Sequence, residues 1–134
     1  ALVFTSSTRS ADNLAEKLKK NKIPATAVHG KKSQGSRSGN LHDFKEGGTQ
    51  ILVATDLIGR GIHIDSLEYV INYELPRSPL DYVHRIGRTG RALESGTAIT
   101  ILTDDELQHF RVIQKKMGKR VELIRTEDIN LHGF

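Results

Sequence analysis

The sequence contains no cysteine, so the chain can form neither a disulfide framework nor a thiolate metal site. Long apolar runs are missing too. None approaches the roughly 20 residues that a membrane-spanning helix needs, and we expect no membrane partner. The 134 residues, 37% of them apolar and 27% charged, suit one domain with a single core. Because "ALVFTSS" reads as a buried strand already under way at the first residue, we expect the chain to be part of a longer polypeptide.

Motifs that hold nucleotides are also missing. "HGKKS" resembles the end of a phosphate loop, but the pattern G-x-x-x-x-G-K-[ST] needs glycine at 25 and Ser or Thr at 32, where the chain has Ala25 and Lys32. No G-x-G-x-x-G follows an expected strand. The six histidines lack the spacing of a metal site, so we expect no metal ligands in this domain. Without a cysteine or a G-x-S-x-G motif, nucleophilic catalysis is unsupported as well.

Positive charge is concentrated in one part of the chain. The net charge is +4, yet the residues from Thr8 to Arg37 include eight Lys or Arg and only two acids, Asp12 and Glu16. Such a stretch is most often a solvated face. It also leaves room for a polyanionic partner.

Short apolar runs alternate with amphipathic segments along the chain. Strands are expected at Leu2–Phe4, Ala25–Val28, Ile51–Ala54, Tyr69–Asn72 and Ala98–Leu102, with Val121–Ile124 as a sixth. Helices are expected over residues 10–20, 33–47, 78–87 and 103–118, with Ser33 and Ser78 as N-caps and a capping box of Thr103 and Glu106. The strands are short and continuous, which is typical of strands covered on both faces. We therefore predict a three-layer α/β fold, a mostly parallel sheet with helices on both faces.

Polar, basic or glycine-bearing loops follow three of these strands. They are "TSSTRS", "HGKKSQGSR" and "TDLIGRGIHID". In a parallel sheet they leave the same edge, where open α/β sheets bind ligands. Hydroxyls, backbone N–H groups and basic side chains at one edge favour binding of phosphates.

The segment "HRIGRTGR" (84–91) gathers one histidine and three arginines. Gly87 and Gly90 allow a tight turn beside Arg88 and Arg91, and each guanidinium donates in a fork that matches phosphate oxygens. Pairing with carboxylates on a neighbouring loop is the alternative. The residues alone leave both interpretations open.

In their order and spacing, four segments resemble the motifs of DEAD-box RNA helicases over roughly residues 1 to 102. "LVFTSS" resembles motif IV, "VHGKKSQGSR" the Q-x-x-R block, "ATDLIGRGIHI" motif V and "HRIGRTGR" motif VI. The resemblance implies the second, C-terminal RecA-like domain of such a helicase. It would span residues 1–134, with a final helix and terminal extension at 103–134, and without the N-terminal ATP-binding domain.

The resemblance also implies roles for single residues. ATP with Mg²⁺ would be held mainly by the absent N-terminal RecA-like domain, a partner of this one, and hydrolysed by phosphoryl transfer to water. Implied catalytic residues are Arg88, Arg91 and His84. Implied ATP contacts are Arg88, Arg91, His63 and Gly61. Implied contacts to the RNA backbone, without base reading, are Thr5, Ser6, Gly30, Gln34, Arg37, Thr55 and Arg60. Implied bracing and interdomain residues are His84, Arg85 and Asp56.

Two positions depart from the family pattern. His63 stands where the family usually has Asp, which by resemblance hydrogen-bonds the ATP ribose. A neutral imidazole can make only one such bond, so we expect weaker nucleotide binding than with Asp. Gly59 replaces the usual alanine, which should loosen the turn before Arg60.

Two other functions remain open from the sequence. One is a non-catalytic RNA- or protein-binding module on the same fold. The other is a DNA helicase of the same superfamily. Comparing strands that carry 2′-OH with strands that carry 2′-H would distinguish it from an RNA helicase. We expect a monomer, located in the cytoplasm or, in a eukaryote, also in the nucleus.

Overall fold

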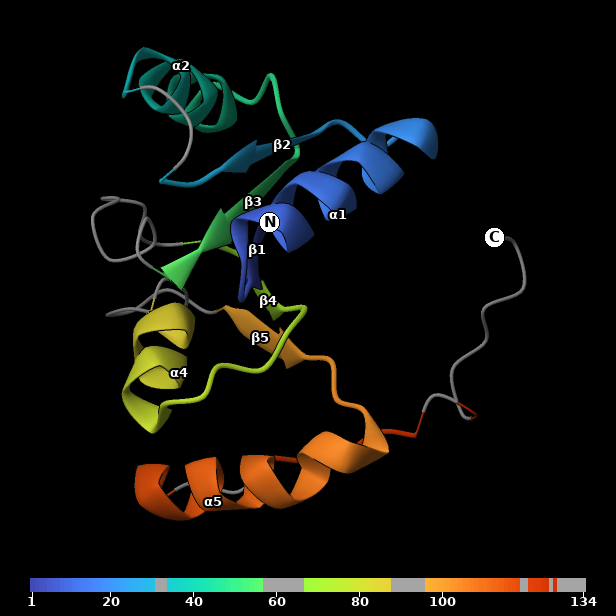
Figure 1. The fold of residues 1–134 in the computed structure, drawn as a ribbon, viewed down its shortest axis with the longest axis vertical. Coiled ribbons are helices and arrows are strands. Elements are labelled where there is room, and N and C mark those ends of the chain that lie inside the picture. The colour runs from blue at the N-terminus through green and yellow to red at the C-terminus, as the bar shows by residue number, and fades with distance from the viewer. Residues whose placement is uncertain (31–33, 57–66, 88–95, 119–120, 126, 128–134) are drawn as a thin grey trace.

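A computed structural model of the chain describes residues 1–30, 34–56, 67–87, 96–118, 121–125 and 127. Five parallel strands in the order β2-β3-β1-β4-β5 form its sheet (Figure 1). The strands are β1 (Leu2–Thr5), β2 (Ala25–Val28), β3 (Ile51–Thr55), β4 (Tyr69–Asn72) and β5 (Thr97–Thr100). The helices are α1 (Thr8–Lys20), α2 (Gln34–Lys45), α4 (Pro79–Ile86) and α5 (Leu107–Met117), the last preceded by the 3₁₀ turn η1 (Asp104–Glu106). The predicted α/β class with a parallel sheet is confirmed.

Caps set three of the helix ends: those at Ser78 and Gly118 are predicted from the sequence, whereas that at Ser7 starts α1 two residues earlier than predicted. The predicted cap Ser33 lies outside the described residues. The Oγ of Ser7 accepts the N–H of Ser10 at 3.1 Å to start α1. The Oγ of Ser78 accepts the N–H of Leu80 at 3.1 Å to start α4, in which Pro79 is the first residue. Gly118 ends α5 at φ +73°, in the left-handed conformation that glycine adopts most easily.

The helices α1 and α2 cover opposite faces of the sheet. The small residues Ala11 and Ala15 of α1 pack closely against one face, together with Val3, Ala27 and Val53. On the other face, Leu41 and Phe44 of α2 pack against a cluster formed by Leu2, Phe4, Val28, Leu52, Ala54 and Val70. Burial on both faces explains why the inner strands read as continuous apolar runs. It also fixes where the strand ends, and hence the loops, must lie.

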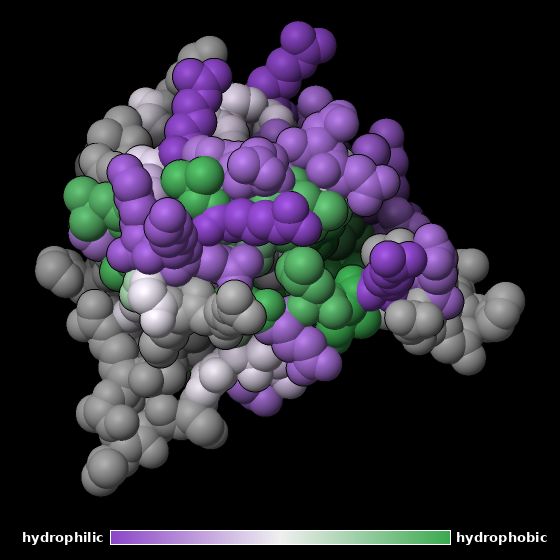
Figure 2. All heavy atoms as spheres, turned by 90° about the horizontal axis from the view of Figure 1, so that it is seen from below, coloured by the Kyte–Doolittle hydropathy of each residue, from purple (hydrophilic) through white to green (hydrophobic). Residues whose placement is uncertain are grey.

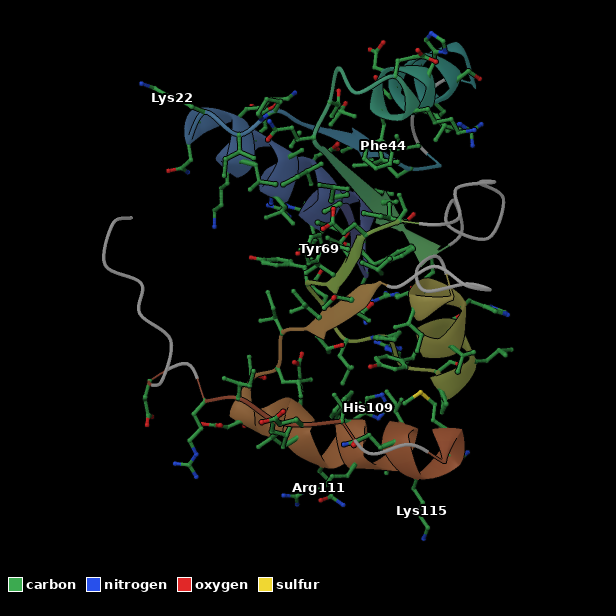
Figure 3. The ribbon with its side chains drawn as sticks, turned by 180° about the vertical axis from the view of Figure 1, so that it is seen from behind. Lys22, Phe44, Tyr69, His109, Arg111 and Lys115 are labelled. Carbon is green, nitrogen blue, oxygen red and sulfur yellow. The ribbon has the colours of Figure 1, made fainter. Side chains whose placement is uncertain are left out.

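A third cluster joins α5 to α4. Leu75, Tyr82, Phe110 and Ile113 are buried together, and the Tyr82 and Phe110 rings meet edge to face with centroids 5.8 Å apart. His109 points from α5 toward the rest of the domain, where its Nε2 lies 3.0 Å from the carbonyl of Pro76, while Arg111 and Lys115 point away (Figure 3). Hydrophilic side chains are prominent on the face seen from below, with apolar atoms between them (Figure 2). The final helix thus supports α4 from the outside.

Two predictions about the C-terminal part are wrong. The segment Val121–Ile124 is not a strand, because none of its residues pairs with a described strand and all are exposed. Instead the N–H of Val121 donates to Gln114 Oε1 at 2.8 Å, and this bond holds the start of the segment next to α5. The edge strand β5 is not covered on both faces, since Ile99 and Ile101 are 43% and 48% exposed. None of the described helices is long and apolar enough to span a membrane.

Candidate functional site

The polar residues of the site lie at the carboxyl ends of the central strands. The register aligns Thr5 of β1 with Thr55 of β3, and Phe4 of β1 with Asn72 of β4. Asp56 follows β3 directly, and α4 lies beside the carboxyl end of β3 (Figure 1). The sequence prediction that these loops share one edge of the sheet is therefore confirmed for the described residues.

Arg85 of α4 is the centre of this arrangement, with only 1% of the residue exposed. Its Nε and Nη2 donate to Asp56 Oδ1 and Oδ2 at 2.5 and 2.7 Å, a bidentate ion pair. Its Nη1 donates to the carbonyl of Glu74 at 2.6 Å and to Asn72 Oδ1 at 3.3 Å. The guanidinium carbon also lies 5.2 Å from the centroid of the Phe4 ring. One side chain thus ties α4 to the ends of β1, β3 and β4.

This network fixes the base from which the segment after α4 departs. Helix α4 ends at Ile86, and the N–H of Gly87 donates to the carbonyl of Val83 at 2.9 Å. His84 lies exposed beside Arg85 on the same helix. The predicted site residues Arg60, Gly61, His63, Arg88 and Arg91 lie outside the described residues. What the described part establishes is an anchored helix immediately before two of those arginines.

Three predicted site residues at the ends of β1 and β3 differ in their exposure to solvent. Thr5 is fully buried, and its hydroxyl donates to the carbonyl of Ser7 at 3.2 Å. Ser6 is exposed, and its N–H donates to Glu74 Oε1 at 3.0 Å. Thr55 is 8% exposed at the end of β3. Of these three predicted residues, Ser6 is the one that the fold presents to solvent.

The end of β2 and helix α2 form the other side of the site. Gly30 is exposed after β2. The residue before it, His29, is buried, and its Nε2 lies 2.9 Å from Asp12 Oδ1 on α1. Gln34 and Arg37 lie one helical turn apart on α2. Arg37 is half-buried, and among the described residues its Nε has no hydrogen-bond partner although it is shielded from solvent. A buried guanidinium N–H without an acceptor is unusual in folded proteins, and an incoming anion would satisfy it.

Sequence reasoning missed Asn72 and Glu74, which complete the Arg85 network. Both occupy positions that could have drawn attention, because Asn72 ends a predicted strand and Glu74 follows two residues later. Polar residues at the carboxyl ends of parallel strands are candidates for the site whatever motif they belong to. Among the described residues, no group of three or more His, Asp or Glu is placed to hold a metal ion.

Comparison with known proteins gives a consistent result. Residues 1–93 match the family described as helicase conserved C-terminal domain. The chain is 39% identical over 133 residues to the ATP-dependent RNA helicase dbp8 of Emericella nidulans, covering 99% of this chain and 25% of that protein. It thus spans about a quarter of the length of the curated relative it matches.

Solved structures agree with the sequence matches. A DEAD box protein from Methanococcus jannaschii superposes with a TM-score of 0.85 at 42% identity, over 89% of this chain and 33% of that one. Dbp5 L327V of S. cerevisiae, bound to RNA and ADP BeF3, superposes with a TM-score of 0.80 at 33% identity, over 87% of this chain and 32% of that one.

Proposed function

Because this chain belongs to the helicase conserved C-terminal domain family, as found in DEAD-box ATP-dependent RNA helicases, we propose that it completes the ATP site and part of the RNA-binding surface of such an enzyme. The observation that carries the proposal is the Arg85 network. It fixes α4, and with it the start of the segment containing Arg88 and Arg91, against the ends of β1, β3 and β4. A catalytic arginine needs such a rigid base, because its guanidinium must meet charge that develops only in the transition state.

On the ATP side, Arg88 and Arg91 donate to the γ-phosphate of a nucleotide that an N-terminal RecA-like domain holds together with Mg²⁺. The two guanidiniums neutralise charge as the phosphoryl group moves to water. His84, exposed on α4, faces the interdomain space, and His63 with Gly61 contacts the nucleotide. The bound Mg²⁺ would supply charge neutralisation at the phosphates.

On the RNA side, the same edge of the sheet grips the sugar–phosphate backbone. The contacts come from Ser6, Gly30, Gln34, Arg37 and Arg60, whereas Thr5 and Thr55, which are buried, support the loops from within. None of the aromatic residues lies in the three polar loops, so grip by base stacking is not expected. Backbone contacts carry no sequence information, which suits an enzyme that separates short duplexes of any sequence.

The test compares this domain with the full-length protein that contains it. The purified domain should release no phosphate from ATP above background, with or without RNA, because it has no phosphate loop. The full-length protein should hydrolyse ATP faster when single-stranded RNA is added, and should separate a short RNA duplex in the presence of ATP. Phosphate release and a gel assay of strand separation measure both. Robust turnover by the domain alone, or a full-length protein indifferent to RNA, would contradict the proposal.

A second prediction concerns His63. In the full-length protein, His63→Asp should tighten ATP binding about threefold to tenfold, because a carboxylate accepts ribose hydroxyl donors more strongly than a neutral imidazole. Titration with a fluorescent ATP analogue measures the dissociation constant. His42→Asp, at an exposed position on α2, makes the same charge change elsewhere and should leave it within about twofold. Equal or tighter binding by the wild type would show that His63 is not a weakened ribose contact.

A further inference from the structure

Glu74 occupies a position that links two parts of the site. It follows β4, and the backbone N–H groups of Tyr73 and Glu74 donate to the carbonyl of Phe4 at 3.1 and 3.4 Å. These bonds extend the pairing of β1 and β4 beyond the last residue of β4. The side chain of Glu74 is therefore held next to the loop that follows β1.

The two ends of Glu74 contact different elements. Its carboxylate Oε1 accepts the backbone N–H of Ser6 at 3.0 Å, in the exposed loop after β1. Its backbone carbonyl accepts the Nη1 of the buried Arg85 at 2.6 Å. One residue thus joins the exposed loop containing Ser6 to the guanidinium that anchors α4.

We infer that Glu74 is a positioning residue that couples RNA bound at the Ser6 loop to helix α4 and the arginines that follow it. This inference rests on the proposed function, because it takes the Ser6 loop as an RNA contact and the residues after α4 as ATP contacts. The path consists of three adjacent bonds: Ser6 to the Glu74 carboxylate, the Glu74 carbonyl to Arg85, and Arg85 to Asp56.

The geometry explains why an acceptor is needed at this position. The N–H of Ser6 points to the Glu74 carboxylate, so the conformation of the loop depends on the position of residue 74. A strand bound at Ser6 that shifts this loop also shifts Glu74, and the carbonyl of Glu74 shifts with it. Arg85 is buried among Asp56, Asn72 and Phe4 and cannot move without disturbing all of them. RNA binding is thereby passed to α4 without a contact between RNA and α4.

The test uses three variants of the full-length protein. Glu74→Ala removes the acceptor for the Ser6 N–H but keeps the backbone carbonyl. Glu74→Gln keeps a side-chain oxygen that can accept it. Glu16→Ala removes a glutamate from the exposed surface of α1, where the side chain is 63% exposed, and serves as the charge-matched control. ATP hydrolysis is measured against RNA concentration and, separately, against ATP concentration.

Glu74→Ala should raise the RNA concentration for half-maximal stimulation about threefold to tenfold, the size expected for loss of one solvent-exposed hydrogen bond. The KM for ATP measured without RNA should stay within about twofold, because the Glu74 carbonyl that accepts from Arg85 is retained and no RNA is present to be coupled. Glu74→Gln should lie within about threefold of the wild type, and Glu16→Ala should match it. Glu74→Ala with an unchanged RNA dependence, or with an equal loss of basal and stimulated rates, would overturn the inference, since the latter pattern indicates general damage to the fold.

Amide hydrogen exchange without RNA or ATP tests the link itself, independently of activity. Exchange at Ser6 and at Arg85 should be faster in Glu74→Ala than in the wild type, and unchanged in Glu16→Ala. Identical exchange in Glu74→Ala and wild type would overturn the inference. A wild type whose ATPase ignores RNA would instead contradict the proposed function, so the two failures are distinguishable.

Discussion

Replacing Asp56 with alanine should lower the free energy of unfolding by about 3 kcal/mol, because it leaves a buried guanidinium without its counter-ion. The Arg85 side chain is 1% exposed, so its guanidinium would stay shielded from water after the carboxylate is lost. The Asp56 side chain is 28% exposed. This partial exposure places the effect at the lower end of the range for buried pairs. In a domain of this size the loss should lower the midpoint of thermal unfolding by roughly 10 °C.

Matched variants separate this effect from a mere change of charge. Asp43→Ala, at an exposed position on α2, should change the unfolding free energy by no more than about 0.5 kcal/mol. Asp56→Asn, which keeps one acceptor, should fall between Asp43→Ala and Asp56→Ala. Urea unfolding of the purified domains, followed by circular dichroism, measures all three. If Asp56→Ala were as stable as Asp43→Ala, the pair would not anchor α4.

The positions of two strands and two helix caps follow directly from the sequence. Ala25–Val28 and Tyr69–Asn72 are predicted and observed with the same bounds, because short apolar runs between polar loops leave little freedom. The caps at Ser78 and Gly118 depend on contacts within a few residues, so local sequence determines them. Such features need no knowledge of the rest of the fold.

Features that depend on distant residues are harder to predict. The run Val121–Ile124 has a strand-like pattern, yet a side chain of α5 takes up its first N–H and the run stays unpaired. The order of the strands is likewise not encoded in any single segment. Glu74 shows the same limit within the site. Its importance arises from Ser6, 68 residues away, and from Arg85 on a later helix, and only the folded chain brings them together.

The family resemblance implies different roles for the three arginines of "HRIGRTGR", and the structure describes one of them. Resemblance implies that Arg85 braces and that Arg88 and Arg91 reach the nucleotide. The structure brings Arg85 and Asp56 into a bidentate pair, so the bracing contact exists, while Arg88 and Arg91 lie outside the described residues. Charge alone could not have separated these roles, because all three guanidiniums are alike in sequence terms. The position of Arg85 in the fold identifies its part, since it is buried on α4 and paired with Asp56.

The division of roles predicts opposite outcomes for two neighbouring substitutions. Arg91→Ala in the full-length protein should lower kcat for RNA-stimulated ATP hydrolysis by about 10³-fold or more, the size expected for an arginine finger. It should leave the unfolding midpoint within about 2 °C of the wild type, because the role we propose for Arg91 is contact with the γ-phosphate rather than support of the fold. Asp56→Ala should instead have its main effect on stability, and should lower kcat of the folded protein far less than 10³-fold, because Arg91 itself is still present.

The measurements are steady-state phosphate release at saturating ATP and RNA, paired with thermal unfolding of the same preparations. Arg111→Ala removes an exposed arginine from α5 and should change neither quantity. RNA affinity in the absence of nucleotide should be unchanged in Arg91→Ala, because the role we propose for this arginine is on ATP rather than on the strand. An Arg91→Ala protein that is unfolded would make the residue structural. One that is folded and fully active would leave the domain as a binding module, with the Arg85 network serving stability alone.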